Sequence, residues 1–313
     1  MNLDERFRGC LIGLACGDAV GTTVEFSPRG TFEPMTDMVG GGPFGLQPGE
    51  WTDDTSMALC LAASLTETGT FDPGDQMDRY CRWYRDGYMA SNGRCFDIGG
   101  TVGAALTRYQ KNGDPIAGSE DPHTAGNGSL MRLAPVPMFY FDDEETAVRF
   151  SGESSKTTHG AREAVEACRL FGWMLVRALA GAAKEEILRG PVPSSLGFSE
   201  PGLQPIADGA YQSKPESEIF GTGYVVAALE AALWCFYRTD DFASAILKAA
   251  NLGDDADTTA AITGQIAGAF YGLEGIPPSW RARLAHYGLI EGLADALHRN
   301  VSPERGHSEF VCY

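Results

Sequence analysis

The spacing of apolar residues is the feature that most constrains how this chain can fold. In Gly223–Arg238, Val226, Leu229, Leu233 and Phe236 recur at helical intervals, without the alternation typical of a half-buried strand. Few stretches elsewhere are rich in β-branched or aromatic residues. The pattern therefore predicts an all-α protein and argues against alternating strands and helices.

Further segments carry the same pattern, and two long segments do not. The additional predicted helices are Phe7–Ala15, Thr55–Leu65, Val102–Tyr109, Ala161–Ala183, Phe242–Ala250, Thr258–Tyr271 and Leu289–Leu297. The Gly- and Pro-rich segments 27–49 and 190–221 are predicted to be irregular loops. No repeat or linker forces a division, so we predict one domain over residues 1–313, with its core at about 3–300.

Charge and cysteine usage exclude several classes of protein. A net charge of -18 argues against sequence-independent binding to nucleic acid or an anionic membrane, because such binding needs a positive field. Asp18 interrupts the N-terminal apolar stretch, and no segment is long enough to span a membrane. The 8 cysteines show no CxxC pair, so we expect buried free thiols rather than a zinc site. We expect a cytoplasmic protein and favour a monomer.

The first motif that indicates chemistry is the run from Trp51 to Met57, which contains Thr52, Asp53 and Asp54 before an apolar helical segment. A helix cap would account for one of these side chains. It leaves two adjacent carboxylates flanked by hydroxyl groups unexplained. Hard cations such as Mg²⁺ and Mn²⁺ prefer these oxygen ligands, so the motif is a candidate metal site.

The second motif lies near the other end of the chain, where Asp254, Asp255 and Asp257 precede Thr258 at the start of another apolar helix. Three aspartates within four residues repel one another unless cations lie among them. Two such clusters in one chain favour a joint site over two decorated helix caps. Two metal ions held there can polarise a substrate and activate water.

Two shorter motifs are weaker on their own. Gly17-Asp18-Ala19-Val20-Gly21 is followed by Glu25, and both acids would ordinarily be surface carboxylates. The run Asn127-Gly128-Ser129 forms a small-residue turn that can cradle phosphate at a helix N-terminus. By contrast, the GxGxxG string at 40–45 contains Pro43 and lacks a strand–helix context, so a dinucleotide site is not expected.

Taken in order, the segments GDAVG, TDDTSM, FDIG, GNGSLMR, THG, TGYVV and GDDADTT resemble the ADP-ribosylglycohydrolase family, the group of dinitrogenase reductase-activating glycohydrolase. The resemblance runs from Gly9 to about Gly272. It implies a single-domain orthogonal bundle of α-helices with two Mg²⁺ or Mn²⁺ ions in a cleft. It also implies hydrolysis of the bond between ADP-ribose and a protein side chain, with the ADP-ribosylated protein as partner.

The resemblance assigns roles by position. It implies that Glu25 approaches the metals from a mobile loop, while Asp254 lies beside them without binding. It implies that Asp97 is a cleft carboxylate in the arginine-cleaving branch; without the match, Asp97 would be a helix cap. The implied metal ligands are Thr52, Asp53, Asp54, Asp255, Asp257 and Thr258, and the implied ADP-ribose contacts are Asn127, Gly128 and Ser129 at the diphosphate, His159, and Tyr224 at the nucleoside end.

The chemistry suits these residues, and several alternatives remain. Glycosidic cleavage through an oxocarbenium-like state needs nearby negative charge and a proton carrier, for which Asp97 and Glu25 are both candidates. Several motifs favour ADP-ribosyl-arginine, with serine-linked ADP-ribose or small ADP-ribosyl compounds as alternatives. A helical diphosphate synthase is disfavoured because Asp254-Asp255-Ala256-Asp257-Thr258 lacks the final aspartate of DDxxD. A non-catalytic ADP-ribose-binding protein is disfavoured because the expected ligands are all present.

Overall fold

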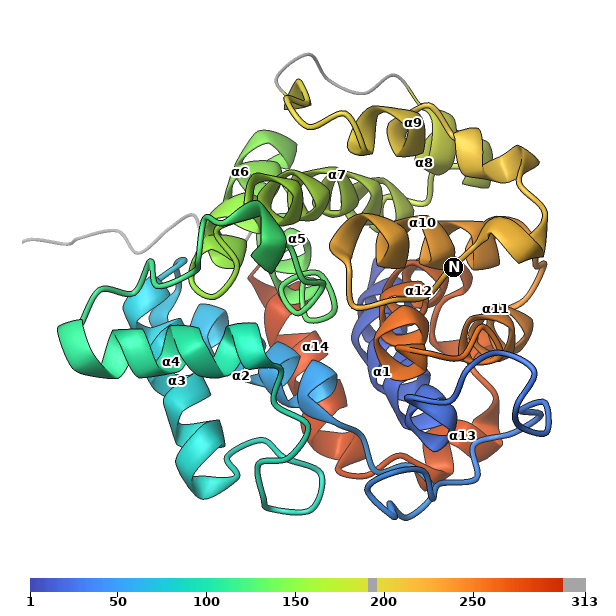
Figure 1. Ribbon diagram of the computed structural model, residues 1–313, viewed down its shortest axis with the longest axis horizontal. Coiled ribbons are helices and arrows are strands. Elements are labelled where there is room, and N and C mark those ends of the chain that lie inside the picture. The colour runs from blue at the N-terminus through green and yellow to red at the C-terminus, as the bar shows by residue number, and fades with distance from the viewer. Residues whose placement is uncertain (191–195, 301–313) are drawn as a thin grey trace, which may run out of the picture.

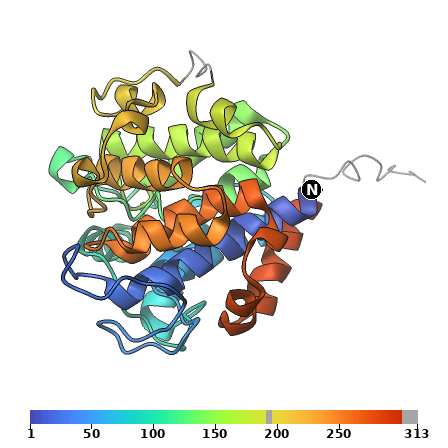
Figure 2. The ribbon, with the colours of Figure 1, turned by 90° about the vertical axis from the view of Figure 1, so that its right-hand side faces the viewer.

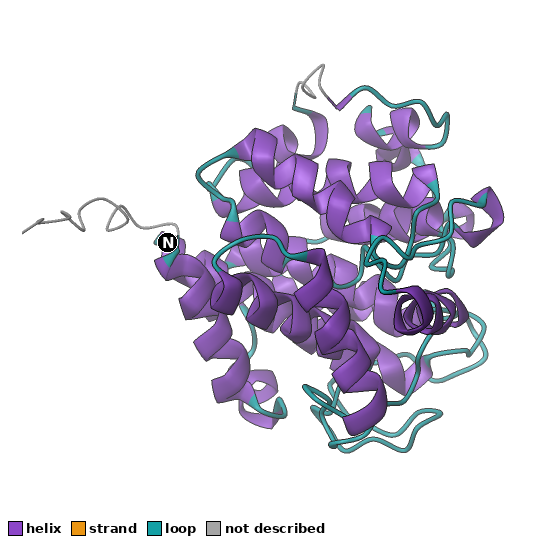
Figure 3. Ribbon diagram, turned by 90° about the vertical axis from the view of Figure 1, so that its left-hand side faces the viewer, coloured by secondary structure: helices purple, strands orange, loops and turns teal. Residues whose placement is uncertain are grey.

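Helices joined by loops make up the computed structural model, which describes residues 1–190 and 196–300. Over these residues Figure 3 draws no strand, and pairing is limited to isolated β-bridges. The all-α prediction is therefore confirmed. The helices are α1 (Leu3–Gly21), α2 (Asp53–Thr68), α3 (Pro73–Asp86), α4 (Gly100–Asn112), α5 (Pro135–Phe139), α6 (Glu144–Lys156), α7 (Arg162–Leu179), α8 (Lys184–Arg189), α9 (Leu203–Ala207), α10 (Val225–Tyr237), α11 (Phe242–Ala250), α12 (Ala256–Tyr271), α13 (Pro278–Arg283) and α14 (Tyr287–Arg299).

Every predicted helix is present, but the prediction missed two long helices, α3 and α6, and the short helices α5, α8, α9 and α13. Both long helices have strongly polar outer faces that dilute the apolar pattern. Local signals for α3 were nevertheless available: the Asp72 side chain caps its first turn, and Gly87 ends it in the left-handed conformation. The predicted helix that continued to residue 183 instead ends at Leu179, before Gly181 at φ 81°.

The two predicted loops differ in outcome. Segment 27–49 contains no helix, as expected. The described part of segment 190–221 is more ordered than predicted, because it contains α9 and 3₁₀ turns at 210–213 and 216–218. Tyr211 and Ile219 are buried there and fix the segment to the core. Residues 191–195, which also fall within that predicted loop, lie outside the described residues.

The centre of the bundle is the close, antiparallel packing of α1 against α12, which Figure 2 shows side by side in blue and orange. Glycines at 9, 13, 17 and 21 of α1 make this approach possible. A Cβ atom on Gly13 would lie 2.4 Å from the carbonyl oxygen of Gly264, and one on Gly17 would lie 2.1 Å from that of Ala260. The packing brings the C-terminal end of α1 to the N-terminal end of α12.

The other helices surround this pair. Figure 1 shows α7 and α10 above α12, and α2, α3 and α4 on the opposite side of the view from α11. None of the described helices combines the length and apolarity needed to cross a membrane. The cysteines in the described chain are free thiols: Cys10, Cys16, Cys60, Cys81, Cys168 and Cys235 are buried and Cys95 is half-buried, while Cys312 lies outside the described residues.

Candidate active site

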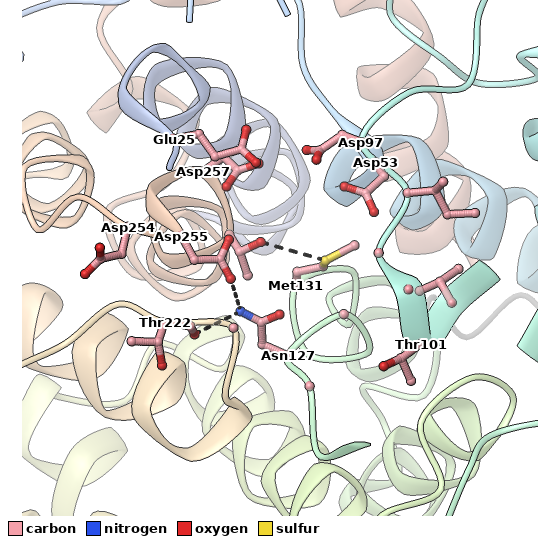
Figure 4. Close-up of a pocket in the computed structure, with 18 of the residues that line it drawn as sticks. Glu25, Asp53, Asp97, Thr101, Asn127, Met131, Thr222, Asp254, Asp255 and Asp257 are labelled. Carbon is pink, nitrogen blue, oxygen red and sulfur yellow. Dashed lines mark hydrogen bonds between the residues drawn. The ribbon is translucent and has the colours of Figure 1, made fainter. Parts of the chain in front are cut away.

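A cavity of about 810 Å³ opens where the N-terminal ends of α2, α4 and α12 converge. This volume suits a nucleotide-sized ligand. Figure 4 shows Asp53 and Asp97 on one side of the cavity and Asp254 and Asp255 on the other. The lining also includes Glu25, Asn127, Gly128, His159, Asp257 and Thr258. Residues from both ends of the chain thus meet in one cleft.

The two acidic motifs contact each other at the base of this cavity. Thr52 and Asp257 are 205 residues apart in sequence, and the Thr52 Oγ1 atom lies 3.2 Å from the Asp257 Oδ2 atom. The same hydroxyl lies 3.2 Å from Asp54 Oδ2 and 2.9 Å from Asp18 Oδ1. Because a hydroxyl group donates one hydrogen bond, only one of these three carboxylates can accept it. The others need a proton or a cation.

Three further carboxylates approach one another closely. Glu25, Asp97 and Asp257 each offer an oxygen, and these oxygens all lie within 4.8 Å of one another. They come from the loop after α1, the loop before α4 and the first turn of α12. Both residues expected to act in proton transfer, Glu25 and Asp97, therefore lie close enough to Asp257 to share a metal ion with it. Sequence reasoning did not group these three.

The electrostatic environment disfavours the ionised form of each acid. Burial and mutual repulsion raise the pKa of Glu25 to about 9 and that of Asp97 to about 7. The same causes raise the pKa values of Asp53, Asp54 and Asp257 well above the usual range. No lysine or arginine in the described chain forms an ion pair with any of these five residues. Bound cations would relieve this repulsion.

The residues at the N-cap positions of α2 and α12 do not use their side chains as caps. Thr52 and Asp255 occupy these positions, yet neither side chain bonds the first turn of its helix. Elsewhere Asp72, Asp143 and Asp241 cap their helices in the ordinary way. Capping therefore does not explain the two acidic motifs. The aligned backbone dipoles at both helix starts add to the attraction for carboxylates there.

Buried oxygen atoms without partners fit the same conclusion. Among the described residues, Asp54 Oδ1 and Asp257 Oδ1 are buried and have no hydrogen-bond partner. Leaving a buried acceptor unpaired is costly, and oxygen-only ligand sets suit hard divalent cations. The acidic cluster can therefore hold a metal ion.

The backbone around the cleft is held in unusual conformations. Phe26, Asp97 and Asp254 have positive φ angles of 61°, 59° and 54°, which side-chain-bearing residues rarely adopt. The Phe26 N–H donates to Asp254 O at 2.7 Å, which docks the Glu25 loop onto the 253–255 segment. Asp97 precedes α4 without capping it, since Gly99 occupies the N-cap position, so the interpretation of Asp97 as a helix cap is wrong.

Asn127, Gly128 and Ser129 form a turn on the cavity wall rather than the start of a helix, because α5 begins only at Pro135. The expectation of a helix N-terminus there is wrong. No described residue accepts a hydrogen bond from the backbone N–H of Gly128 or Ser129. Asn127 Nδ2 donates to Asp255 Oδ2 at 2.7 Å, which ties the turn to the second acidic motif. Gly128 lines the cavity, so its free N–H is suited to bind an anion there.

The remaining residues expected to contact ADP-ribose differ in how deeply they are buried. His159 is buried and lines the cavity, directly behind Gly126 and Gly128. The Ser129 hydroxyl lies 2.8 Å from Ser155 Oγ, and the buried Ser129 does not line the cavity. Tyr224 lies at the rim and is 43% exposed, with its hydroxyl donating to Glu163 at 2.6 Å.

Sequence reasoning missed two buried charged residues beside the cleft. Asp18 is fully buried, so its interpretation as a surface carboxylate is wrong, as is that of Glu25 at 4% exposure. Asp18 Oδ2 accepts from Thr55 N and Thr55 Oγ1, at 3.0 and 2.6 Å, and so fixes the start of α2. Its position inside an apolar helical run was the available signal. Arg132, also fully buried, lies behind the 127–129 turn.

Comparison with known proteins supports the interpretation of this site. Residues 1–306 match the ADP-ribosylglycohydrolase family. The chain belongs to this family. The glycohydrolase is 48% identical over 293 residues to ADP-ribosylarginine hydrolase Tri1 of Pseudomonas putida, covering 94% of this chain and 78% of that protein. It is 31% identical to the ADP-ribosyl-[dinitrogen reductase] glycohydrolase of Rhodospirillum rubrum, covering 90% and 91%.

A solved structure shares the fold. The glycohydrolase matches a chain of an "ADP-ribosylglycohydrolase-related protein complex" with a TM-score of 0.86 and 45% identity, over 96% of this chain and 99% of that one. The resemblance inferred from the motifs is thus confirmed. The protein is an enzyme that hydrolyses ADP-ribosyl bonds.

Proposed function

We propose that this glycohydrolase removes ADP-ribose from arginine side chains of modified proteins, with two Mg²⁺ or Mn²⁺ ions held between its acidic motifs. The observation that carries the proposal is the convergence of carboxylates from both ends of the chain at one cavity, with no cationic side chain paired to them in the described part of the chain. The proposed ligands are Thr52, Asp53, Asp54, Asp255, Asp257 and Thr258.

The arginine linkage rests on two kinds of support. Relatives named ADP-ribosylarginine hydrolase are 48% and 45% identical to this chain. Within the cavity, Asp97 lies beside Glu25 and Asp257, so a carboxyl group next to the acidic cluster is available to face the leaving group. A carboxylate there can hold the guanidinium of a leaving arginine by charge-assisted hydrogen bonds. The neutral hydroxyl of a leaving serine would not form such bonds.

The chain's own residues divide the remaining work. The Gly128 backbone N–H group binds the diphosphate, and Tyr224 packs at the nucleoside end of the cavity. Asp97 or Glu25 moves the proton that cleavage of the C–N bond requires. Metal ions held by the acidic motifs would supply Lewis-acid chemistry, by which ribose hydroxyls can be oriented and the pKa of an attacking water lowered.

The proposed activity is tested with proteins ADP-ribosylated on arginine, on serine or on acidic residues, each incubated with the enzyme and Mn²⁺ or with EDTA. We expect release of ADP-ribose from arginine only, lost in EDTA and restored by Mn²⁺ or Mg²⁺. Release from serine but not arginine would refute the linkage. Full turnover by enzyme shown to be metal-free would refute the metal centre.

A further inference from the structure

Arg132 is a fully buried cation that forms no ion pair with an acidic side chain in the described chain. Its guanidinium lies over the Tyr80 ring, 4.7 Å from the ring centroid. Nη1 donates to Gly128 O at 2.9 Å, and Nη2 donates to Thr158 Oγ1 at 2.7 Å. A buried guanidinium is retained only where acceptors surround it, and here one acceptor, Gly128 O, belongs to a residue that lines the cavity.

Thr158 connects Arg132 to His159 through hydrogen bonds of its hydroxyl group. The Thr158 Oγ1 atom lies 2.9 Å from His159 Nδ1, and the threonine is fully buried. Arginine can only donate, so Thr158 Oγ1 accepts from it and keeps its own proton to donate. The His159 Nδ1 atom is the only other hydrogen-bond partner of this hydroxyl among the described residues. If Nδ1 carried a proton, the hydroxyl proton would be buried without an acceptor.

The imidazole of His159 is neutral, because burial and the nearby Arg132 lower its pKa to about 3. A neutral imidazole has one N–H donor and one acceptor. With Nδ1 accepting from Thr158, the proton must lie on Nε2. That atom faces the 126–128 turn: Cβ atoms built on Gly126 and Gly128 would lie 3.3 and 3.2 Å from it.

We infer that Arg132 and Thr158 are positioning residues that hold His159 as the Nε2–H tautomer, so that it donates a hydrogen bond to a diphosphate oxygen at Gly128. The opposite tautomer would present a lone pair to an anion and repel it. The inference rests on the proposed function for the identity of the anion, but the tautomer follows from the protein's own hydrogen bonds.

The tautomer is measured directly by two-bond ¹H–¹⁵N correlation spectra of the full-length protein labelled with ¹⁵N-histidine, without any substrate. The His159 signals are assigned by comparison with His159→Gln. We expect a protonated Nε2, an unprotonated Nδ1 and no titration between pH 5 and pH 8. A protonated Nδ1, or a signal that titrates in this range, would overturn the inference. Because no turnover is involved, failure of the proposed reaction would leave this result unchanged.

The relay is tested with Thr158→Val, which keeps shape but removes the hydroxyl, and with Thr158→Ser as the matched control. We expect Thr158→Val to shift His159 toward the Nδ1–H form and to weaken ADP-ribose binding about tenfold, the size of one hydrogen bond to a charged group. Thr158→Ser should retain the tautomer and the affinity. Unchanged tautomer and affinity in Thr158→Val, or equal losses in both variants, would contradict a positioning role.

Discussion

Without metal, the protein should lose stability as pH rises, and Glu25 allows the size of this effect to be worked out. Its pKa is about 9 in the folded protein against 4.5 for an ordinary glutamate, because it is buried beside Asp97 and Asp255. Between these two values the folded state keeps a proton that the unfolded chain releases. Each pH unit in that interval therefore costs about 1.4 kcal/mol of unfolding free energy.

From pH 5 to pH 8 this amounts to roughly 4 kcal/mol from Glu25 alone, or about 6 °C in Tm for a chain of this size. The stabilisation from Glu25 is fully present below the pKa of this residue in the unfolded chain. It is lost as pH rises to the pKa of Glu25 in the folded protein. In EDTA, Glu25→Gln should remove the share of the slope that Glu25 contributes and melt higher than wild type at pH 8, with little difference at pH 5. In Mn²⁺ the order should reverse, because the ionised cluster is then the form that binds the cation.

The assay is thermal melting followed by circular dichroism at pH 5, 6, 7 and 8, in EDTA and in Mn²⁺. The exposed Glu33→Gln on the 27–49 loop removes the same charge away from the cluster and should follow wild type. A wild-type Tm in EDTA that stays flat or rises between pH 5 and pH 8 would refute the reasoning. So would a Glu25→Gln variant without any gain at pH 8.

Two further predictions concern the cleft. Asp53→Ala and Asp257→Ala should each lose Mn²⁺ binding in calorimetric titrations and most of the activity. The double variant should be little worse, because residues of one site act as a unit. If the activity losses multiply and each single variant retains metal, the two residues belong to separate sites. Asp97→Asn should lower turnover on ADP-ribosyl-arginine roughly a hundredfold while Mn²⁺ binding and ADP-ribose binding persist. If the variant loses metal together with activity, Asp97 is a metal ligand instead.

Apolar periodicity was sufficient to predict the helices that face the core, because burial selects that spacing directly. It missed α3, whose outer face is too polar, although Asp72 and Gly87 mark both of its ends. The sequence also indicated the two acidic motifs as candidate metal sites, because adjacent aspartates repel one another unless cations lie among them. The role of a single charged residue was harder to predict: Asp18 offered only its position inside an apolar helical run, and the burial of Arg132 beside the cleft is revealed only by tertiary packing.

The convergence of the two acidic motifs depends on glycines in α1 that permit close helix packing but carry no reactive group. Gly17 and Gly21 let α1 approach the first turns of α12 so closely that a Cβ on Gly21 would lie 2.4 Å from Ala256 O. Any larger residue there would force the helices apart, because real Cβ atoms essentially never come within 3.0 Å of such an atom. Since Glu25 follows α1 and Asp257 opens α12, the same displacement would separate two carboxylates that now lie within 4.8 Å. The glycines thus set the geometry of the acidic cluster without contributing an atom to it.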